Sequence, residues 1–400
     1  MKKTGILFAA LLLSGLIYGQ PVLDHLLRAD AYIKTGKYDK AIELLSSVLS
    51  EQQDSRLYVK RADAYIVNGD YSAAIADLNV SNEIIESSGE YGLARVYALK
   101  GDAATSLYHL EISMKSPFRK SEKEIMLDPA FSKIENSQLW RQFWRNPWYT
   151  GLETRISEIE YYVGAGKTSD AAAILSEIEG NYFEEENIKY ARALVNYSAG
   201  KLEDALKTTS DLLKSDPDNE KYLRLLARLQ TLSSNHAGAS LTYTKLISNE
   251  IPDVELYMRR AESYRKTGQT DKALADIEKY LSYYPEDKSA LTFAGRTLVA
   301  NGDNLEALRY FSLNLKMHPN DPQCYIDRAN TYMLSKSYEW AVNDYSMALD
   351  LDPYNSEVWL NKGIALLGSG KTEDACHDFR QSFILGNKKA TDYISRQCIK

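Results

Sequence analysis

Apolar residues recur along most of this chain at the spacing of an α-helix, in short segments that come in pairs. Tyr257, Ala261 and Tyr264 share one helical face, with charged residues between them, and a second set at the same spacing follows from 273 to 281. The pattern predicts short amphipathic helices that each bury one face.

The paired segments repeat every 34 residues in the second half of the chain. Small residues mark the first helix of each pair, with Ile159 as a bulkier first member: Ala193, Ala227, Ala261, Gly295, Ala329 and Gly363. Alanine follows twelve positions after each: Ala171, Ala205, Ala239, Ala273, Ala307, Ala341 and Ala375. Missing bulk at two fixed positions lets two helices cross closely, and a period of this length indicates a repeat solenoid.

Residues typical of turns punctuate each pair. Glycine stands seven positions after the small residue in most units, and Ser234 and Lys336 are the exceptions: Gly166, Gly200, Gly268, Gly302 and Gly370. Proline closes several units, where it begins a helix without losing a hydrogen bond: Pro217, Pro285, Pro319 and Pro353.

The same signature occurs three times nearer the start, around Ala29, Ala62 and Ala94. With a tyrosine three positions after the small residue, as in Tyr32 and Tyr264, these units resemble the tetratricopeptide repeat (TPR) family. The resemblance implies an all-α fold, an α-solenoid with a right-handed superhelix of about ten helix-turn-helix units and a capping helix at its carboxyl end.

The repeats and their interruptions divide the chain into five parts. We expect a signal peptide over 1–19, an array of three units over 20–116, a tryptophan-rich helical connector over 117–150, an array of seven units over 151–387, and a capping helix over 388–400.

Four units carry a basic residue just before the small position and an aspartate sixteen positions later. The pairs are Arg61 with Asp77, Arg260 with Asp276, Arg328 with Asp344, and Lys362 with Asp378. Arg28 and Arg192 lack such an aspartate. We predict ion pairs between the two helices of a unit, and partly exposed pairs would contribute only about 0.2–1 kcal/mol each.

The connector holds Trp140, Trp144 and Trp148, preceded by four basic residues. Trp140 and Trp144 share a helical face and could plug the junction between the arrays. Pro147 takes Trp148 off that face. The alternative is an aromatic and basic contact for a partner or the envelope surface.

Near the carboxyl end, Cys376 and Cys398 lie at equal distances from Asn387, where the last helix folds back. A disulfide between them and a pair of free thiols are the two alternatives. Cys324 is most simply a buried small residue.

The amino terminus and the charge indicate where the protein acts. Lys2 and Lys3 precede an apolar stretch over 6–17 and a small residue, Gly19, as in a secretory signal, with an uncleaved anchor as the alternative. We expect an exported chain, periplasmic, peripherally associated with the outer membrane, or secreted, with no integral span in the mature part. A net charge of -7 disfavours nucleic acid as a partner.

The sequence features that suggest nucleotide or metal binding are incomplete. The segments 164–168 and 368–372 look like the end of a phosphate-binding loop, but they lack its first glycine and its preceding strand. The five histidines are scattered and give no metal spacing. We therefore expect no cofactor, no metal and no enzymatic activity.

In the TPR family the first helix of each unit lines the concave side, so the resemblance places candidate binding residues by position. A basic centre would comprise Arg224, Arg228, Arg265, Lys266 and Arg296. An apolar carboxyl-terminal end would comprise Ile326, Asn330, Met333, Leu334, Leu360, Ile364 and Leu367. This groove suits a segment with acidic residues beside apolar ones. Only Asn330 fits the asparagine of the family's carboxylate clamp.

The sequence thus favours a non-enzymatic adaptor or scaffold of a bacterial cell envelope that binds segments of partner proteins. The alternative is an envelope glycan or solute binder, with Tyr190 and Tyr197 as an aromatic platform. The oligomeric state stays open.

Overall fold

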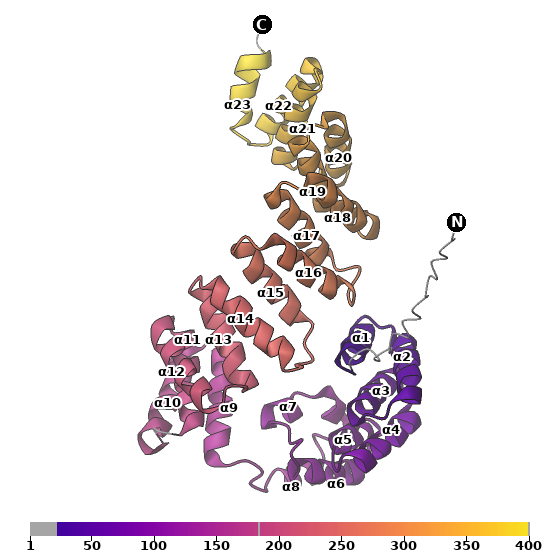
Figure 1. Cartoon of the computed structure of the whole chain (residues 1–400), viewed down its shortest axis with the longest axis vertical. Coiled ribbons are helices and arrows are strands. Elements are labelled where there is room, and N and C mark those ends of the chain that lie inside the picture. Colours follow the sequence, from indigo (N-terminus) through magenta and orange to yellow (C-terminus); the bar gives the residue numbers. More distant parts are fainter. Residues whose placement is uncertain (1–21, 183–184, 399–400) are drawn as a thin grey trace, which may run out of the picture. The chain divides into compact units, whose positions relative to one another are not determined.

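The computed structural model describes residues 22–182 and 185–398, so the expected signal peptide lies outside the described residues. Within these stretches the regular secondary structure is helical, with no strand, and the predicted all-α solenoid of paired helices is confirmed. The chain forms two compact units: unit 1 ends at Trp148 and unit 2 begins at Tyr149 (Figure 1).

Unit 1 contains three antiparallel helix pairs followed by a short closing segment. The pairs are α1 (Val22–Lys34) with α2 (Tyr38–Glu51), α3 (Ser55–Asn68) with α4 (Tyr71–Ile84), and α5 (Glu90–Leu99) with α6 (Ala103–Met114). The closing segment comprises α7 (Glu122–Met126), the 3-10 helix η1 (Pro129–Lys133) and α8 (Gln138–Phe143).

Unit 2 contains seven pairs and a final short helix. The pairs are α9 (Gly151–Gly164) with α10 (Thr168–Tyr182), α11 (Glu186–Ser198) with α12 (Leu202–Ser215), α13 (Glu220–Leu232) with α14 (His236–Ser248), α15 (Glu255–Lys266) with α16 (Thr270–Leu281), α17 (Lys288–Asn301) with α18 (Asn304–Met317), α19 (Pro322–Leu334) with α20 (Tyr338–Leu351), and α21 (Ser356–Gly368) with α22 (Thr372–Ile384). The chain continues into α23 (Ala390–Tyr393) and the π-helical turn η2 (Ile394–Cys398). We call the first helix of each pair the A helix and the second the B helix.

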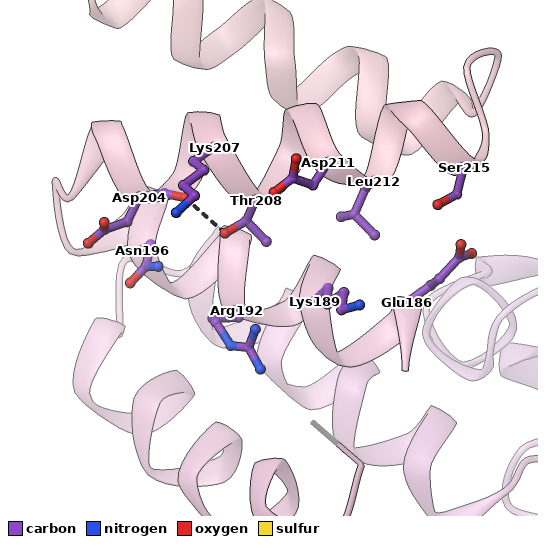
Figure 2. Close-up of a pocket in the computed structure, with 10 residues that line it drawn as sticks. All are labelled: Glu186, Lys189, Arg192, Asn196, Asp204, Lys207, Thr208, Asp211, Leu212 and Ser215. Atoms are coloured by element: carbon purple, nitrogen blue, oxygen red, sulfur yellow. Dashed lines mark hydrogen bonds between the residues drawn. The ribbon is translucent and has the colours of Figure 1, made fainter. Parts of the chain in front are cut away.

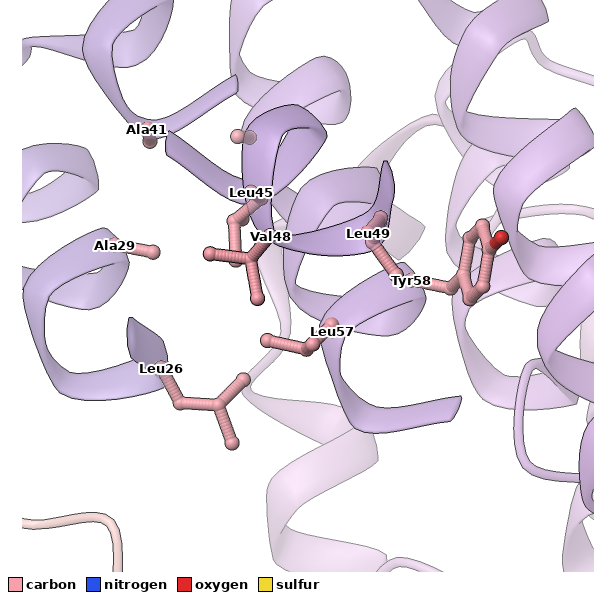
Figure 3. Packing of buried hydrophobic residues seen from close by; sticks show 9 residues of the cluster. Leu26, Ala29, Ala41, Leu45, Val48, Leu49, Leu57 and Tyr58 are labelled. Carbon is pink, nitrogen blue, oxygen red and sulfur yellow. The ribbon is translucent and has the colours of Figure 1, made fainter. Parts of the chain in front are cut away.

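Each pair buries its small residues where its helices cross. Ala29 of α1 and Ala41 of α2 are fully buried in a cluster that also contains Leu45 and Leu57 (Figure 3). The cluster includes α3, the A helix of the next pair, so neighbouring units share their cores. This sharing explains why such repeats are stable only in series.

Two units carry glycine where most others carry alanine, and in both a phenylalanine lies opposite. A Cβ atom added at Gly295 would lie 2.5 Å from the Cζ atom of Phe311. At Gly363 an added Cβ would lie 2.6 Å from Phe379. Each ring stands sixteen positions after its glycine, a pairing that our sequence analysis missed.

The turns between A and B helices use the left-handed backbone region that the glycines predict. Gly302 has φ of 91° and ends α17. Ser234 and Lys336, the two exceptions to glycine, take φ of 58° and 55° at the same turn position. L-residues adopt this region at a cost of about 1 kcal/mol, so both positions carry local strain.

The four predicted ion pairs are confirmed. Arg260 donates two hydrogen bonds of 2.7 Å to the carboxylate of Asp276, and Lys362 lies 3.2 Å from Asp378. The aspartates are buried, whereas their basic partners keep 16–22% of their side-chain surface exposed. Removing the basic partner would leave a buried charge, which costs about 3–5 kcal/mol rather than a fraction of one.

The arginine of each ion pair also contacts the preceding helix pair. Arg260 contacts the hydroxyl group of Thr244 at 3.1 Å, and Arg61 contacts that of Ser46 at 2.9 Å. Each guanidinium group therefore joins three helices and fixes the stacking of neighbouring pairs.

Candidate functional site

The A helices of successive pairs lie on one side of the array. We call this side the inner face. In the described parts of the chain, A helices of successive pairs contact each other, as α9 contacts α11 and α11 contacts α13. No comparable contact joins two B helices there. Lys221 of α13 even reaches Glu160 of α9, with 3.2 Å between Nζ and Oε1. The inner face is therefore the one on which the sequence places the candidate binding residues.

The predicted basic centre lies on this face, but acidic side chains neutralise most of it. The contacts are Arg224 with Glu220 and Asp253, each at 2.7 Å, Arg265 with Glu262 at 2.7 Å, Lys266 with Glu262 at 4.0 Å, and Arg296 with Asp327 at 3.0 Å. Our sequence analysis did not consider these carboxylates, although Glu262 directly follows the small residue Ala261 and could have been placed on the same helix face.

Arg228 differs from the other four residues. It is exposed on α13, and among the described residues it makes no ion pair. Leu232, one helical turn further on, leaves 57% of its surface exposed. The inner face therefore offers an uncompensated cation beside an apolar side chain.

The tyrosines proposed as a glycan platform are mostly covered. The Tyr190 ring lies 5.5 Å from the ring of Tyr222 and 5.8 Å from the ammonium group of Lys221. Burial and the Glu160 carboxylate raise the pKa of Tyr190 above its usual range, while Arg228 lowers it. Tyr197 is half-buried against the core between α11 and α12. Both rings therefore pack partly within the array.

The predicted apolar end divides into two parts. On α19, Leu334 is 58% exposed, whereas Ile326 and Met333 are half-buried. Asn330, the candidate clamp residue, accepts a hydrogen bond of 2.6 Å from the hydroxyl group of Tyr345. Its carbonyl oxygen is thus engaged within the unit.

The residues predicted on α21 share a core with the chain's own carboxyl-terminal segment. Leu360 is buried in it, and Ile364 and Leu367, which keep part of their surface exposed, pack against the same cluster as Tyr393 and Ile394. Of these three side chains, only Leu360 is closed to a partner in this conformation.

The pair α11/α12 shows what happens where the inter-helix aspartate is missing. Thr208 occupies the aspartate position, and Arg192 instead pairs with Glu179 of α10. In Figure 2 the guanidinium group is directed away from Thr208. A cavity of about 490 Å³ opens there between the two helices, lined by three basic and three acidic residues with polar neighbours: Glu186, Lys189, Arg192, Asn196, Asp204, Lys207, Thr208, Asp211, Leu212 and Ser215. We assign it no ligand.

The described residues give no indication of catalytic or metal chemistry. Over 22–182 and 185–398 no three His, Cys, Asp or Glu side chains are placed to hold a metal ion. Burial raises the pKa of the Cys324 thiol to about 11, which keeps it protonated near neutral pH. Gly166 and Gly370 of the loop-like segments lie in turns between helices. In the part of the chain that the structure describes, we find no helix with the length and apolarity of a membrane span.

Comparisons with known proteins agree with this architecture. A tetratricopeptide repeat family model matches residues 26–81 and 258–322. The DnaJ homolog subfamily C member 3 of Gallus gallus is 22% identical over 325 residues, which cover 80% of this chain and 58% of that protein. The Hsp70-Hsp90 organizing protein 1 of Glycine max is 22% identical over 228 residues, or 54% of this chain and 39% of that protein. This chain thus spans less than two thirds of either relative.

Among solved structures, the carboxyl-terminal part of a TPR repeat-containing protein from Cytophaga hutchinsonii matches with a TM-score of 0.52. The sequences are 14% identical, and the match covers 59% of this chain and 98% of that one. The fold defines the class: a helical repeat array built from antiparallel helix pairs. In the matched repeats and in its fold the chain is similar to TPR repeat proteins.

Proposed function

We propose that this protein is a scaffold of a bacterial cell envelope that binds a segment of a partner protein on the inner face of unit 2, with Arg228 as the anchor. The observation that carries the proposal is the exposed Arg228 among cations that already have carboxylate partners. A partner carboxylate gains most where it does not have to displace an existing one.

The neighbourhood of Arg228 defines the segment it would take. Leu232 stands one turn further along α13, so the charge and the apolar side chain are about 6 Å apart along one helix face. A partner with an acidic residue next to an apolar one would engage both. The sequence already predicts a partner with this combination of residues. We now propose that it binds at one part of the basic centre, Arg228.

Export supports the envelope location. The first nineteen residues have the composition of a secretory signal, and the Cys376–Cys398 disulfide suits an oxidising compartment. Periplasmic residence, peripheral association with the outer membrane, or secretion follows from this proposal. Fractionation of cells that express the whole chain, beside a chain without residues 2–19, tests it; retention of the whole chain inside the cytoplasm would refute export.

Charge reversal tests the binding face. We expect Arg228→Glu to weaken capture of envelope proteins by about tenfold or more, since one attractive contact becomes repulsive. Arg380→Glu is the matched control, because Arg380 is also exposed and lies on a B helix. Quantitative mass spectrometry of the captured proteins gives the readout. Equal losses with the two variants, or none with either, would contradict the proposal.

A further inference from the structure

The carboxyl end of unit 2 is closed by residues 390–398, which we call the cap segment. It follows α22 after a turn at Gly386 and comprises α23 and η2, at the yellow end of the chain in Figure 1. Ala390 is fully buried, and the Tyr393 ring stacks on Phe379 with 4.8 Å between centroids. Ile394 and Cys398 pack on the same core. The cap segment thus occupies the place that the next A helix takes in every preceding unit.

Besides these contacts, one covalent bond holds the cap segment in place. Cys398 is bonded to Cys376 of α22, with 5.6 Å between the Cα atoms. The other A helices of unit 2 have twelve to fourteen residues, whereas α23 has four and η2 five. Helices of this length are unstable alone in water, so docking depends on the surface beneath and on the disulfide.

The surface beneath the cap segment is apolar. The cap segment packs mainly on α22, where Phe379 is fully buried under the Tyr393 ring, and Leu360 of α21 is buried in the same core. This apolar end of the array is therefore accessible to a partner only when the cap segment leaves.

We propose that the Cys376–Cys398 disulfide is a redox latch that controls access to this apolar end of unit 2. Reduction releases the cap segment, and the uncovered surface binds an amphipathic helix of a partner protein. The occupant's chemistry is given by the segment that now sits there: a small residue, then an aromatic one three positions later and an aliphatic one four positions later, like Ala390, Tyr393 and Ile394. This second docking position rests on the proposed scaffold function, whereas release of the cap segment does not.

The reductant is a dithiol protein, and the reaction is thiol–disulfide exchange. A thiolate of the reductant attacks the sulfur of Cys398, which is less buried than that of Cys376, and Cys376 leaves as the thiolate. The reductant's second thiolate then attacks its own sulfur in the mixed disulfide and releases Cys398. Two electrons and two protons pass to the chain as two thiols, and the reductant becomes a disulfide.

Hydrogen exchange of the full chain tests the latch. We expect amides of residues 390–398 to lose protection at least tenfold when a phosphine reductant is added. Unit 1 is the internal reference: equal loss in α3 and α4 would mean general unfolding and not release. Unchanged protection of the cap segment in the reduced chain would overturn the proposal.

Binding in trans provides a second test. The probe is a fluorescent peptide with the sequence of residues 388–400 and serine in place of cysteine. We expect it to bind the reduced chain at least tenfold more tightly than the oxidised chain, and the Cys376→Ser/Cys398→Ser variant should bind it without reductant. Equal binding to oxidised and reduced chains would refute the latch.

Arg228→Glu separates this inference from the proposed function. The variant should leave both cap readouts unchanged, because Arg228 lies on α13 and the latch on α22 and η2. A working latch with no effect of Arg228→Glu on capture would refute the proposed anchor alone. The reverse outcome would refute the latch alone.

Discussion

The two units cover the apolar face at their carboxyl ends in different ways. Unit 1 closes with an aromatic cluster in which Trp140, 6% exposed, lies 5.3 Å from Phe131 and 5.7 Å from Trp144 between ring centroids. Unit 2 closes with the nine-residue cap segment and a disulfide. A repeat array must cover its last apolar face, and the comparison shows that either buried aromatic area or a cross-link can do so.

The difference has a consequence for regulation. The aromatic closure of unit 1 consists of η1 packed on α5 and α8 packed on α6, with no disulfide among its described residues. Its stability should not respond to reductant. The closure of unit 2 depends on a bond that the environment can make or break. We therefore expect the closure of unit 1 to be permanent and that of unit 2 to be adjustable.

The largest effect is expected when the aromatic closure is broken. Trp140→Ala should reduce the stability of unit 1 by about 3–5 kcal/mol, because it opens a cavity in the cluster. Denaturant titration followed by hydrogen exchange resolves the two units. Trp340→Ala is the control, because that side chain is 64% exposed and its loss should cost less than about 0.5 kcal/mol. Comparable losses in the two variants would contradict the account of unit 1.

Breaking the other closure should cost less. Reduction of Cys376–Cys398, which closes a loop of 22 residues, should destabilise the end of unit 2 by about 3 kcal/mol in the chain-entropy model. The denaturant midpoint of α21 and α22 should fall while that of unit 1 stays constant. A shift in both units, or in neither, would show that the closures do not differ as described.

A pair of matched substitutions compares the end of unit 2 with its middle. Gly295→Ala and Gly363→Ala each force a methyl group against a phenylalanine ring, which costs about 1–3 kcal/mol. Phe311 is enclosed by regular helices, whereas Phe379 lies under the cap segment, which can yield. We expect Gly295→Ala to be the more harmful in denaturant titrations. A larger loss for Gly363→Ala would indicate that the cap segment is as rigid as the interior.

The smallest effect concerns a turn within unit 2. Lys336→Gly should raise stability by up to about 1 kcal/mol, because glycine adopts positive φ without strain. Both closures should be unaffected, so only the midpoint of the surrounding helices should move. Gly302→Ala, at the equivalent turn, should have the opposite sign. A loss of stability with Lys336→Gly would mean that the lysine side chain makes a contact that matters more than the strain.

The repeat made most of the fold predictable. Because each unit obeys the same register, the helix pairs, the glycine turns and the Arg260–Asp276 type of ion pair could be placed by counting positions. From the sequence, Cys376 was expected either to form a disulfide with Cys398 or to be a free thiol. In the structure the two cysteines are bonded. Burial of Trp140 favours packing over the partner contact for the connector.

The candidate site was less predictable because it depends on contacts between units. The meeting of Arg224 with Asp253, or of Arg296 with Asp327, depends on the distance between successive A helices, which no single unit reveals. Burial of Leu360 in the terminal core depends on contacts beyond its own helix pair, among them those of the cap segment. Trp148 shows a similar limit: it is off the helix, yet its ring stacks on Phe143 at 4.6 Å.

The most direct test of the inner face is hydroxyl-radical footprinting of the full chain with a partner that it captures and Arg228→Glu does not. Leu232 and Leu241 are a built-in matched pair, since both are leucines of the α13/α14 unit, 57% and 72% exposed, on its A and B helices. We predict that the bound partner protects Leu232 from oxidation and leaves Leu241 unchanged. Protection of Leu241 without protection of Leu232 would contradict binding on the inner face.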